Sequence, residues 1–238
     1  MTPSPEMASI VPIDRLDLAF VPQPWVFARE RRADIDSFFA TLQRENPALW
    51  NGRVLMLRHH AVAERSFKGE YLETDYASFA AWQRWGRPPA AVYDCFGAAA
   101  ILTADNAYLL GVMGAGTLNA GKIYFPCGTP DPNDIVDGRV DLEFSVRREL
   151  KEETGIDIGE FTAEPGWTTV FDLPLIAHMK VLRHRERAEV LRARMLGHLA
   201  RERQPELADI RIVRSPADFD PAMPHFVTAF LAQRFTVR

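Results

Sequence analysis

Cysteine is scarce in this chain, and its scarcity limits what kind of protein it is. The 238 residues include two cysteines, Cys95 and Cys127, which lie far apart and form no CxxC motif. A chain of this length buries roughly 70% of the surface that its unfolded form exposes, so it needs no disulfide or structural metal to hold its fold. We expect both cysteines to be plain thiols in a reducing compartment.

Long apolar runs and an excess of basic residues are also missing. The longest apolar runs, such as Gly97–Leu102 and Ala107–Met113, fall well short of the ~20 residues that a membrane-spanning helix needs. The net charge of −4 gives no global positive field, so neither nucleic acid nor a membrane is an expected partner. The N-terminal segment carries Glu6 where a secretion signal would be basic, which makes the cytoplasm the expected location.

What the chain does contain is typical of a globular protein, with 47% hydrophobic and 25% charged residues. The turn Gly86-Arg87-Pro88-Pro89 suggests a division into a small α+β extension, residues 1–90, and a larger domain, residues 91–238. In the extension the sequence predicts an irregular arm or edge strand over residues 1–25, helices over Ala28–Glu45 and Tyr76–Trp85, the second capped by Asp75, and a hairpin of Arg53–Arg58 and Phe67–Leu72.

The larger domain has the pattern of an antiparallel sheet with interspersed helices. It begins with two apolar strands joined at Asp105-Asn106, followed by a glycine-rich loop, Gly114–Gly121. Phe144, Val146 and Leu150 supply the apolar positions of a helix over Leu142–Glu153, which Gly155 ends. Further along, the sequence predicts strands over Thr168–Leu182, broken near Asp172-Leu173-Pro174, and over Ile210–Val213, and helices over Arg185–Arg203 and Pro224–Gln233.

Three glutamates in the helix predicted over Leu142–Glu153 are the most informative feature of the sequence. Glu149, Glu152 and Glu153 stand at i, i+3 and i+4 and therefore project from one helix face. Clustered carboxylate oxygens suit Mg²⁺ or Mn²⁺, which retain waters and substrate phosphates as further ligands. A solvated, salt-bridged helix end is the alternative, but the order of Arg148, the glutamates, Gly155 and two flanking aliphatic residues favours a site.

The segment Arg148-Glu149-Leu150-Lys151-Glu152-Glu153-Thr154-Gly155-Ile156 resembles the second half of the box that defines the Nudix hydrolases. The resemblance covers about Tyr93 to Arg238 and implies an α/β fold, a Nudix-type α/β/α sandwich with a mixed sheet, here preceded by the α+β extension. It implies that Glu149, Glu152 and Glu153 bind Mg²⁺ or Mn²⁺ and that Arg148 orients a glutamate, which makes these four residues the expected catalytic set. Members of the family are often dimeric, which leaves a homodimer open.

The first half of the box departs from the family pattern. Val140 stands where the family has glutamate, and Gly128 takes the place of the box glycine only if the following loop is longer than usual. Asp137, Asp141 and Glu143 are candidates to replace the missing carboxylate. The general base is either Glu152 or a carboxylate from a later loop.

The resemblance implies hydrolysis of a nucleoside diphosphate linked to another moiety, a small-molecule substrate. The order of elements in the extension is similar to the UDP-sugar pyrophosphatase branch, which implies cleavage of a UDP-sugar or other NDP-sugar to NMP and a sugar 1-phosphate. ADP-ribose is the alternative substrate, and a nucleotide sensor without turnover is the alternative function. The arginine-rich stretch Arg183–Arg203 is either a solvated helix face or a phosphate contact, and Gly114–Gly121 is expected near the rim of the active site.

Overall fold

The computed structural model describes residues 8–47 and 49–236, which fall into two compact units. The first contains the described residues of segments 1–14, 96–128 and 143–238, and the second contains those of 15–95 and 129–142. The sequence places one boundary after residue 90, near the passage from Cys95 to Phe96, and that division stays a prediction. No helix within the described residues is long and apolar enough to cross a membrane.

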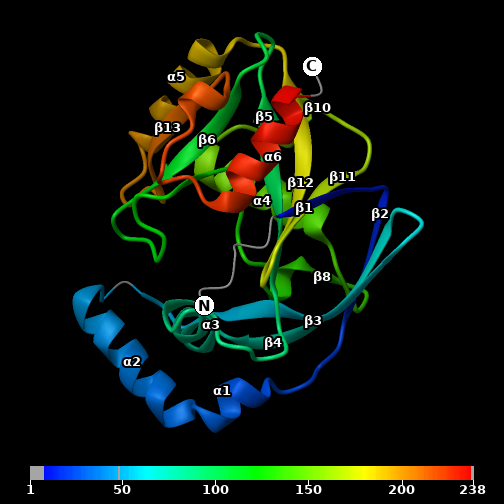
Figure 1. The fold of residues 1–238 in the computed structure, drawn as a ribbon. Coiled ribbons are helices and arrows are strands. Elements are labelled where there is room, and N and C mark those ends of the chain that lie inside the picture. Colours follow the sequence, from blue (N-terminus) through cyan, green and yellow to red (C-terminus); the bar gives the residue numbers. More distant parts are fainter. Residues whose placement is uncertain (1–7, 48, 237–238) are drawn as a thin grey trace, which may run out of the picture. The chain divides into compact units, whose positions relative to one another are not determined.

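The first unit is built on a sheet with the strand order β1-β11-β12-β5-β6-β13, in which β10 also pairs with β12 and β7 with β6 (Figure 1). Its strands are β1 (Ser9–Ile13), β5 (Asp94–Leu102), β6 (Tyr108–Met113), β7 (Ile123–Tyr124), β10 (Phe161–Ala163), β11 (Trp167–Asp172), β12 (Leu175–His184) and β13 (Leu207–Val213). The predicted hairpin at Asp105-Asn106 is confirmed, as is the break between β11 and β12.

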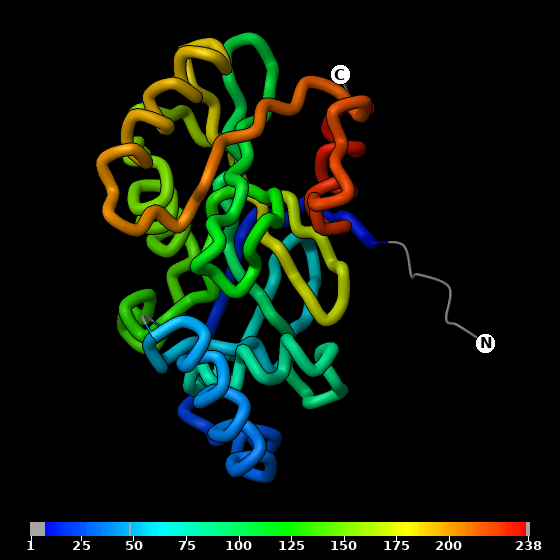
Figure 2. The backbone as a smooth tube through the Cα atoms, turned by 90° about the vertical axis from the view of Figure 1, so that its left-hand side faces the viewer, coloured from blue at the N-terminus to red at the C-terminus, as the bar shows by residue number. Residues whose placement is uncertain are grey.

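Helices cover both sides of this sheet. They are α4 (Leu142–Thr154), α5 (Ala188–Leu199) and α6 (His225–Thr236). Figure 2 shows α6 on one side of the sheet and α4 and α5 on the other. The predicted mixed α/β class and the layered arrangement of helix, sheet and helix are therefore confirmed for this unit.

The second unit is a mixed sheet with the strand order β3-β4-β2-β9-β8 and helices of its own. Its elements are β2 (Arg15–Phe20), α1 (Val26–Glu30), α2 (Arg32–Glu45), β3 (Arg53–Ala63), β4 (Ser66–Asp75), α3 (Tyr76–Arg84), β8 (Ile135–Val136) and β9 (Arg139–Val140). The predicted hairpin is β3 and β4, and the helix predicted over Ala28–Glu45 is interrupted at Arg31. Asp75 caps α3 as expected, with Oδ1 accepting a hydrogen bond from the Ser78 amide at 2.9 Å.

The N-terminal arm is more regular than the sequence suggests. Its first strand, β1, lies at the edge of the first sheet beside β11, as an edge strand would. Its second strand, β2, instead lies inside the second sheet, parallel to β4 and antiparallel to β9. The expectation for residues 1–7 lies outside the described residues.

Asp94, at the start of β5, is buried at the edge of the second unit without a good partner. The residue is 4% exposed, and its Oδ1 has no hydrogen-bond partner among the described residues. It forms a long ion pair with Arg87, whose Nη2 lies 3.9 Å from Oδ2. Burial raises the pKa of Asp94 from 3.8 to about 6, and the positive charge of Arg87 opposes this only in part. The folded protein therefore holds this proton at pH values where the unfolded chain releases it.

We expect Asp94→Asn to stabilise the protein at neutral pH. Because the folded state binds the extra proton, stability falls as pH rises from about 4 to about 6, and the ionised Asp94 costs about 3 kcal/mol at pH 7. Asparagine has the same shape and no charge, so its advantage should be small at pH 4 and largest at pH 7. Urea unfolding at both pH values measures it. A variant less stable than the wild type at pH 7 would show that the pairing with Arg87 outweighs burial.

Candidate functional site

Helix α4 holds the predicted site, and its apolar face anchors it in the first unit. Leu142, Val146 and Leu150 are all at most 2% exposed. Phe144, which the sequence counts among the apolar positions, is instead 38% exposed, and Leu142 takes its place on the buried face. Because this apolar face packs in the core, the orientation of α4 is fixed, and so are the positions from which its polar side chains project.

Gly155 ends α4 as predicted. Its φ of +72° is a left-handed conformation that glycine adopts without strain, and its amide donates to the Lys151 carbonyl at 2.9 Å. A Cβ atom here would lie 2.5 Å from Cγ of His198, so α5 packs directly against this turn. His198 Nε2 also lies 3.1 Å from the Glu152 carbonyl oxygen. The end of α4 is therefore fixed by α5.

The structure separates the three glutamates by burial. Glu149 and Glu153 are 8% and 3% exposed, whereas the side chain of Glu152 is 60% exposed. Arg148 Nη1 donates to Glu149 Oε1 at 2.8 Å and lies 3.5 Å from Glu152 Oε2. This charge-assisted contact places the Glu149 carboxylate, the kind of positioning that the resemblance implies for Arg148.

Glu153 is the most unusual side chain of the group. Neither of its carboxylate oxygens has a hydrogen-bond partner among the described residues, although both are buried. Burial raises the pKa of Glu153 well above its usual value, the negative charge of Glu149 raises it further, and the amide of Cys127 opposes them. A carboxylate buried this deeply, with little besides the Cys127 amide to offset burial, is costly to ionise unless a positive charge lies next to it.

The turn Pro126-Cys127-Gly128 lies against this carboxylate group. A Cβ atom at Gly128 would be 2.2 Å from Glu149 Oε1, which means that the backbone passes directly over the carboxylate. The sequence offers Gly128 as the box glycine only with a longer following loop, and this contact gives a physical reason for a glycine at that position.

A fourth carboxylate belongs to the same group, and the sequence does not single it out. Glu206 stands just before β13, and its pKa is raised by desolvation and by the charge of Glu152, while its own charge raises the pKa of Glu153. It lies 53 positions after Glu153, beyond any helical spacing, so no local pattern connects the two. The expectation of a carboxylate from a later loop is the only signal that points to it.

The candidates for the missing box glutamate have other surroundings. Val140 itself is 5% exposed and apolar. Glu143 has an exposed side chain whose Oε1 accepts a hydrogen bond from Lys180 Nζ at 3.0 Å. Asp137, at a φ of +49°, and Asp141 belong to the second unit. Their role as a replacement for the missing glutamate stays a prediction.

The donor set fits a divalent cation, although it is not arranged as a finished coordination sphere. Besides burial, the charges of Glu149, Glu206 and Glu152 raise the pKa of Glu153, whose two buried oxygens have no hydrogen-bond partner among the described residues. Carboxylate oxygens are the ligands that Mg²⁺ and Mn²⁺ prefer. Among the described residues, however, no three His, Cys, Asp or Glu side chains are already spaced to hold a metal ion. Of these carboxylates, that of Glu152 has the least constrained position, because its side chain is exposed.

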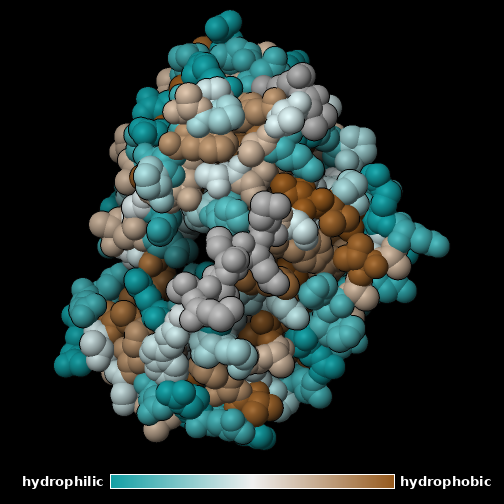
Figure 3. Space-filling model, in the orientation of Figure 1, coloured by the Kyte–Doolittle hydropathy of each residue, from teal (hydrophilic) through white to brown (hydrophobic). Residues whose placement is uncertain are grey.

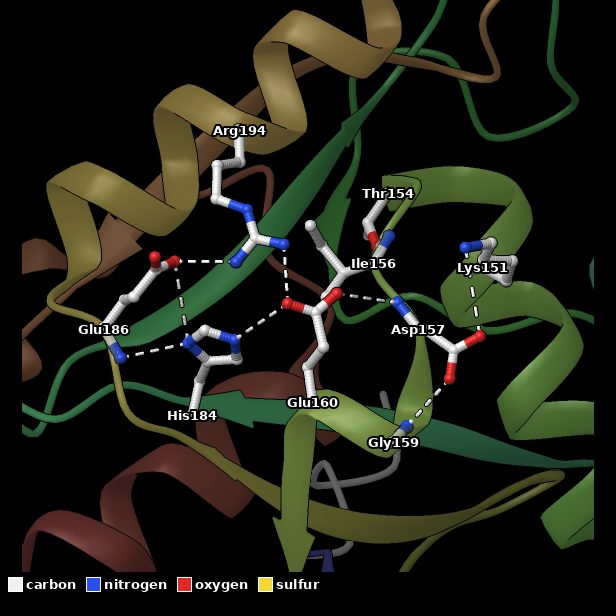
Figure 4. A network of polar contacts seen from close by, with 9 residues as sticks. All are labelled: Lys151, Thr154, Ile156, Asp157, Gly159, Glu160, His184, Glu186 and Arg194. Atoms are coloured by element: carbon white, nitrogen blue, oxygen red, sulfur yellow. Dashed lines mark hydrogen bonds and ion pairs between the residues drawn. The ribbon is translucent and has the colours of Figure 1, made fainter.

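A separate polar network fixes α5 beside the site. Arg194 donates to Glu186 at 2.8 Å and to Glu160 at 2.6 Å, as Figure 4 shows. The Glu186 amide donates to Nδ1 of His184, which is nearly buried at the end of β12. Burial lowers the pKa of His184 first of all, so its imidazole is favoured in the neutral form. These contacts connect α5, β12 and the segment that follows α4.

Comparisons with known proteins give only a distant similarity. No family model matches the chain, and no curated protein matches it. Among solved structures, a Nudix hydrolase from M. smegmatis, RenU, shares 13% identity over 60% of this chain and 83% of that chain, with a TM-score of 0.37. The MutT protein from Methanosarcina mazei Go1 shares 20% identity over 61% of this chain and 96% of that chain, with a TM-score of 0.41.

Proposed function

We propose that this protein is a divalent-cation-dependent pyrophosphohydrolase of the Nudix type, which hydrolyses a nucleoside diphosphate linked to another moiety. The observation that carries the proposal is Glu153, a buried carboxylate with two unpartnered oxygens beside Glu149. The order of residues from Arg148 to Ile156 supports it independently, because it matches the second half of the Nudix box.

In this proposal Glu149, Glu152 and Glu153 hold Mg²⁺ or Mn²⁺. Such a cation neutralises charge on a diphosphate and lowers the pKa of a bound water. Arg148 orients Glu149 through its 2.8 Å hydrogen bond and so keeps that carboxylate facing the site. Glu152 and Glu206 are the two residues of the carboxylate group with exposed surface, and either is suited to accept a proton from the attacking water. The products are a nucleoside monophosphate and the phosphorylated moiety.

For the substrate we propose a UDP-sugar or another NDP-sugar, with ADP-ribose as the alternative. The support is the predicted similarity of the extension to the UDP-sugar pyrophosphatase branch, and the elements that carry it are present as α2, the β3-β4 hairpin and α3. The identity of the linked moiety is a more specific claim than the type of reaction, and the choice of active substrate in the assay below tests it on its own.

The test is a turnover assay on the full chain with Mg²⁺ and a panel of UDP-sugars, ADP-ribose, coenzyme A and NADH. Phosphate released after coupling to a phosphatase should appear with at least one member and should disappear when EDTA removes the cation. Binding without turnover on every member would replace the hydrolase by the sensor alternative. Equal turnover with and without EDTA would remove the cation from the proposal.

A further inference from the structure

Helix α4 ends with backbone carbonyls that the helix itself does not satisfy. The last four carbonyl groups of an α-helix have no amide partner one turn further along. The Lys151 carbonyl accepts a hydrogen bond from the Gly155 amide. The Ile156 amide, four residues after Glu152, donates to the Thr154 hydroxyl instead, at 3.2 Å. The carbonyl of Glu152 therefore depends on a partner from outside the helix.

That partner is His198, in the last turn of α5. Its Nε2 lies 3.1 Å from the Glu152 carbonyl oxygen, and because a carbonyl oxygen can only accept, Nε2 carries the hydrogen and is the donor. The carboxylate of Glu202 lies 3.8 Å from the same nitrogen, which is beyond hydrogen-bond distance. His198 thus caps the end of α4 from a neighbouring helix.

The imidazole is held in place for this hydrogen bond. A Cβ atom at Gly155 would lie 2.5 Å from Cγ of His198, so the ring lies directly against the turn that ends α4. Helix α5 is itself anchored by Leu191 and Met195, which are both 0% exposed, and by the ion pairs of Arg194. Hydrophilic residues cover much of this end of the first unit (Figure 3), in keeping with a solvated outer side of α5.

Glu152 is the carboxylate whose position this contact affects most. Its side chain is 60% exposed, and its Oε2 lies 3.5 Å from Nη1 of Arg148, at the limit of a hydrogen bond. The point from which this side chain projects is therefore set by the backbone, at the end of a helix, where helices fray. Glu153 is the next residue, so the same turn of backbone places both carboxylates.

We propose that His198 is a positioning residue of the candidate site. By donating to the Glu152 carbonyl, it holds the last turn of α4 so that Glu152 and Glu153 project from fixed backbone positions when the cation binds. This inference rests on the proposed function and adds to it a residue outside the box. Without the donor, cation binding must itself order that turn, and this cost lowers the affinity while leaving the bound state unchanged.

The test compares two variants of His198. His198→Phe keeps an aromatic ring against Gly155 but has no donor, whereas His198→Gln has an amide donor and no ring. In His198→Phe, the Kd for Mn²⁺ measured by calorimetry and the Mg²⁺ concentration that gives half the maximal rate should both rise about tenfold, the effect of one lost hydrogen bond. At saturating Mg²⁺, kcat and the substrate KM should stay within about twofold. His198→Gln should recover most of the loss.

The control is His225→Phe, the same substitution at the first residue of α6, where Nδ1 of the imidazole lies 3.0 Å from Oδ1 of Asp172. It should leave all four quantities at wild-type values. The His198 side chain is 21% exposed, and His198→Ala, for which we expect the same rise, takes the place of His198→Phe if the larger ring prevents folding.

Wild-type Mn²⁺ affinity in His198→Phe, an equal loss in His198→Gln or an equal loss in His225→Phe would each overturn the positioning role and leave the hydrolase standing. So would a tenfold fall in kcat that saturating Mg²⁺ does not restore. Weaker Mn²⁺ binding by His198→Phe, in a protein that turns over no substrate, would support the positioning role and reject the hydrolase. A wild-type protein that binds no Mn²⁺ would overturn both.

Discussion

Replacing Glu153 by glutamine is expected to lower kcat about a thousandfold. Glutamine has nearly the same volume as glutamate and keeps one carbonyl oxygen, but it cannot carry the charge that binds a divalent cation. Losing a cation ligand removes several kcal/mol of transition-state stabilisation, and about 4 kcal/mol corresponds to this factor. Initial rates at saturating Mg²⁺ and substrate measure the effect.

Stability gives a second, independent readout of the same variant. The wild-type protein should gain thermal stability on addition of Mg²⁺, because a cation that binds only the folded state shifts the folding equilibrium. Glu153→Gln should lose most of this shift. Without a cation the variant should be at least as stable as the wild type, because burial already favours the neutral form of Glu153.

Glu189→Gln is the matched control, since it removes one carboxylate charge from an exposed position of α5 where Arg214 lies 2.5 Å away. Activity and the Mg²⁺ shift should both stay at wild-type values there. If Glu153→Gln retained wild-type kcat and a full Mg²⁺ shift, Glu153 would not be a cation ligand and the proposed function would lose its main support.

The sequence predicts α4 well because the information is local. Its apolar positions repeat with helical spacing, Gly155 marks its end, and the predicted and observed ends differ by one residue. The same spacing correctly puts three carboxylates on one face. It does not predict that Glu149 and Glu153 are buried while Glu152 is exposed, because burial depends on segments distant in sequence, such as the turn at Gly128 that lies against Glu149.

The other differences between the predictions and the structure also arise from contacts between segments that are distant in sequence. Strand β2 lies parallel to β4, and a parallel pair leaves no hairpin signal between its strands. Glu206 joins the carboxylate group only because β13 pairs with β6 and brings the start of β13 toward the loop after β6. Local periodicity contains neither fact, so the sequence alone predicts the helix of the site more completely than its surroundings.

Gly128→Ala is expected to lower kcat about a hundredfold with little effect on folding. The new Cβ would lie 2.2 Å from Oε1 and 2.5 Å from Cδ of Glu149, so that carboxylate must move and its 2.8 Å bond to Arg148 must change. Misplacing a positioned group by about 1 Å costs activity on this scale. The atom in the way is the tip of a flexible side chain, and Gly128 is not among the glycines with positive φ, so alanine adopts this backbone without strain.

Shortening the displaced side chain provides the decisive comparison for this variant. In the Gly128→Ala, Glu149→Asp double variant, the carboxylate is one methylene further back, so the clash is relieved and kcat should recover part of the loss relative to Gly128→Ala. Gly197→Ala is the control, because its Cβ would meet only Arg201 at 3.8 Å and alanine in a helix interior adds up to about 1 kcal/mol of stability. Wild-type kcat in Gly128→Ala would mean that the position of Glu149 beneath this turn has no part in catalysis, since the substitution cannot leave that carboxylate where it is.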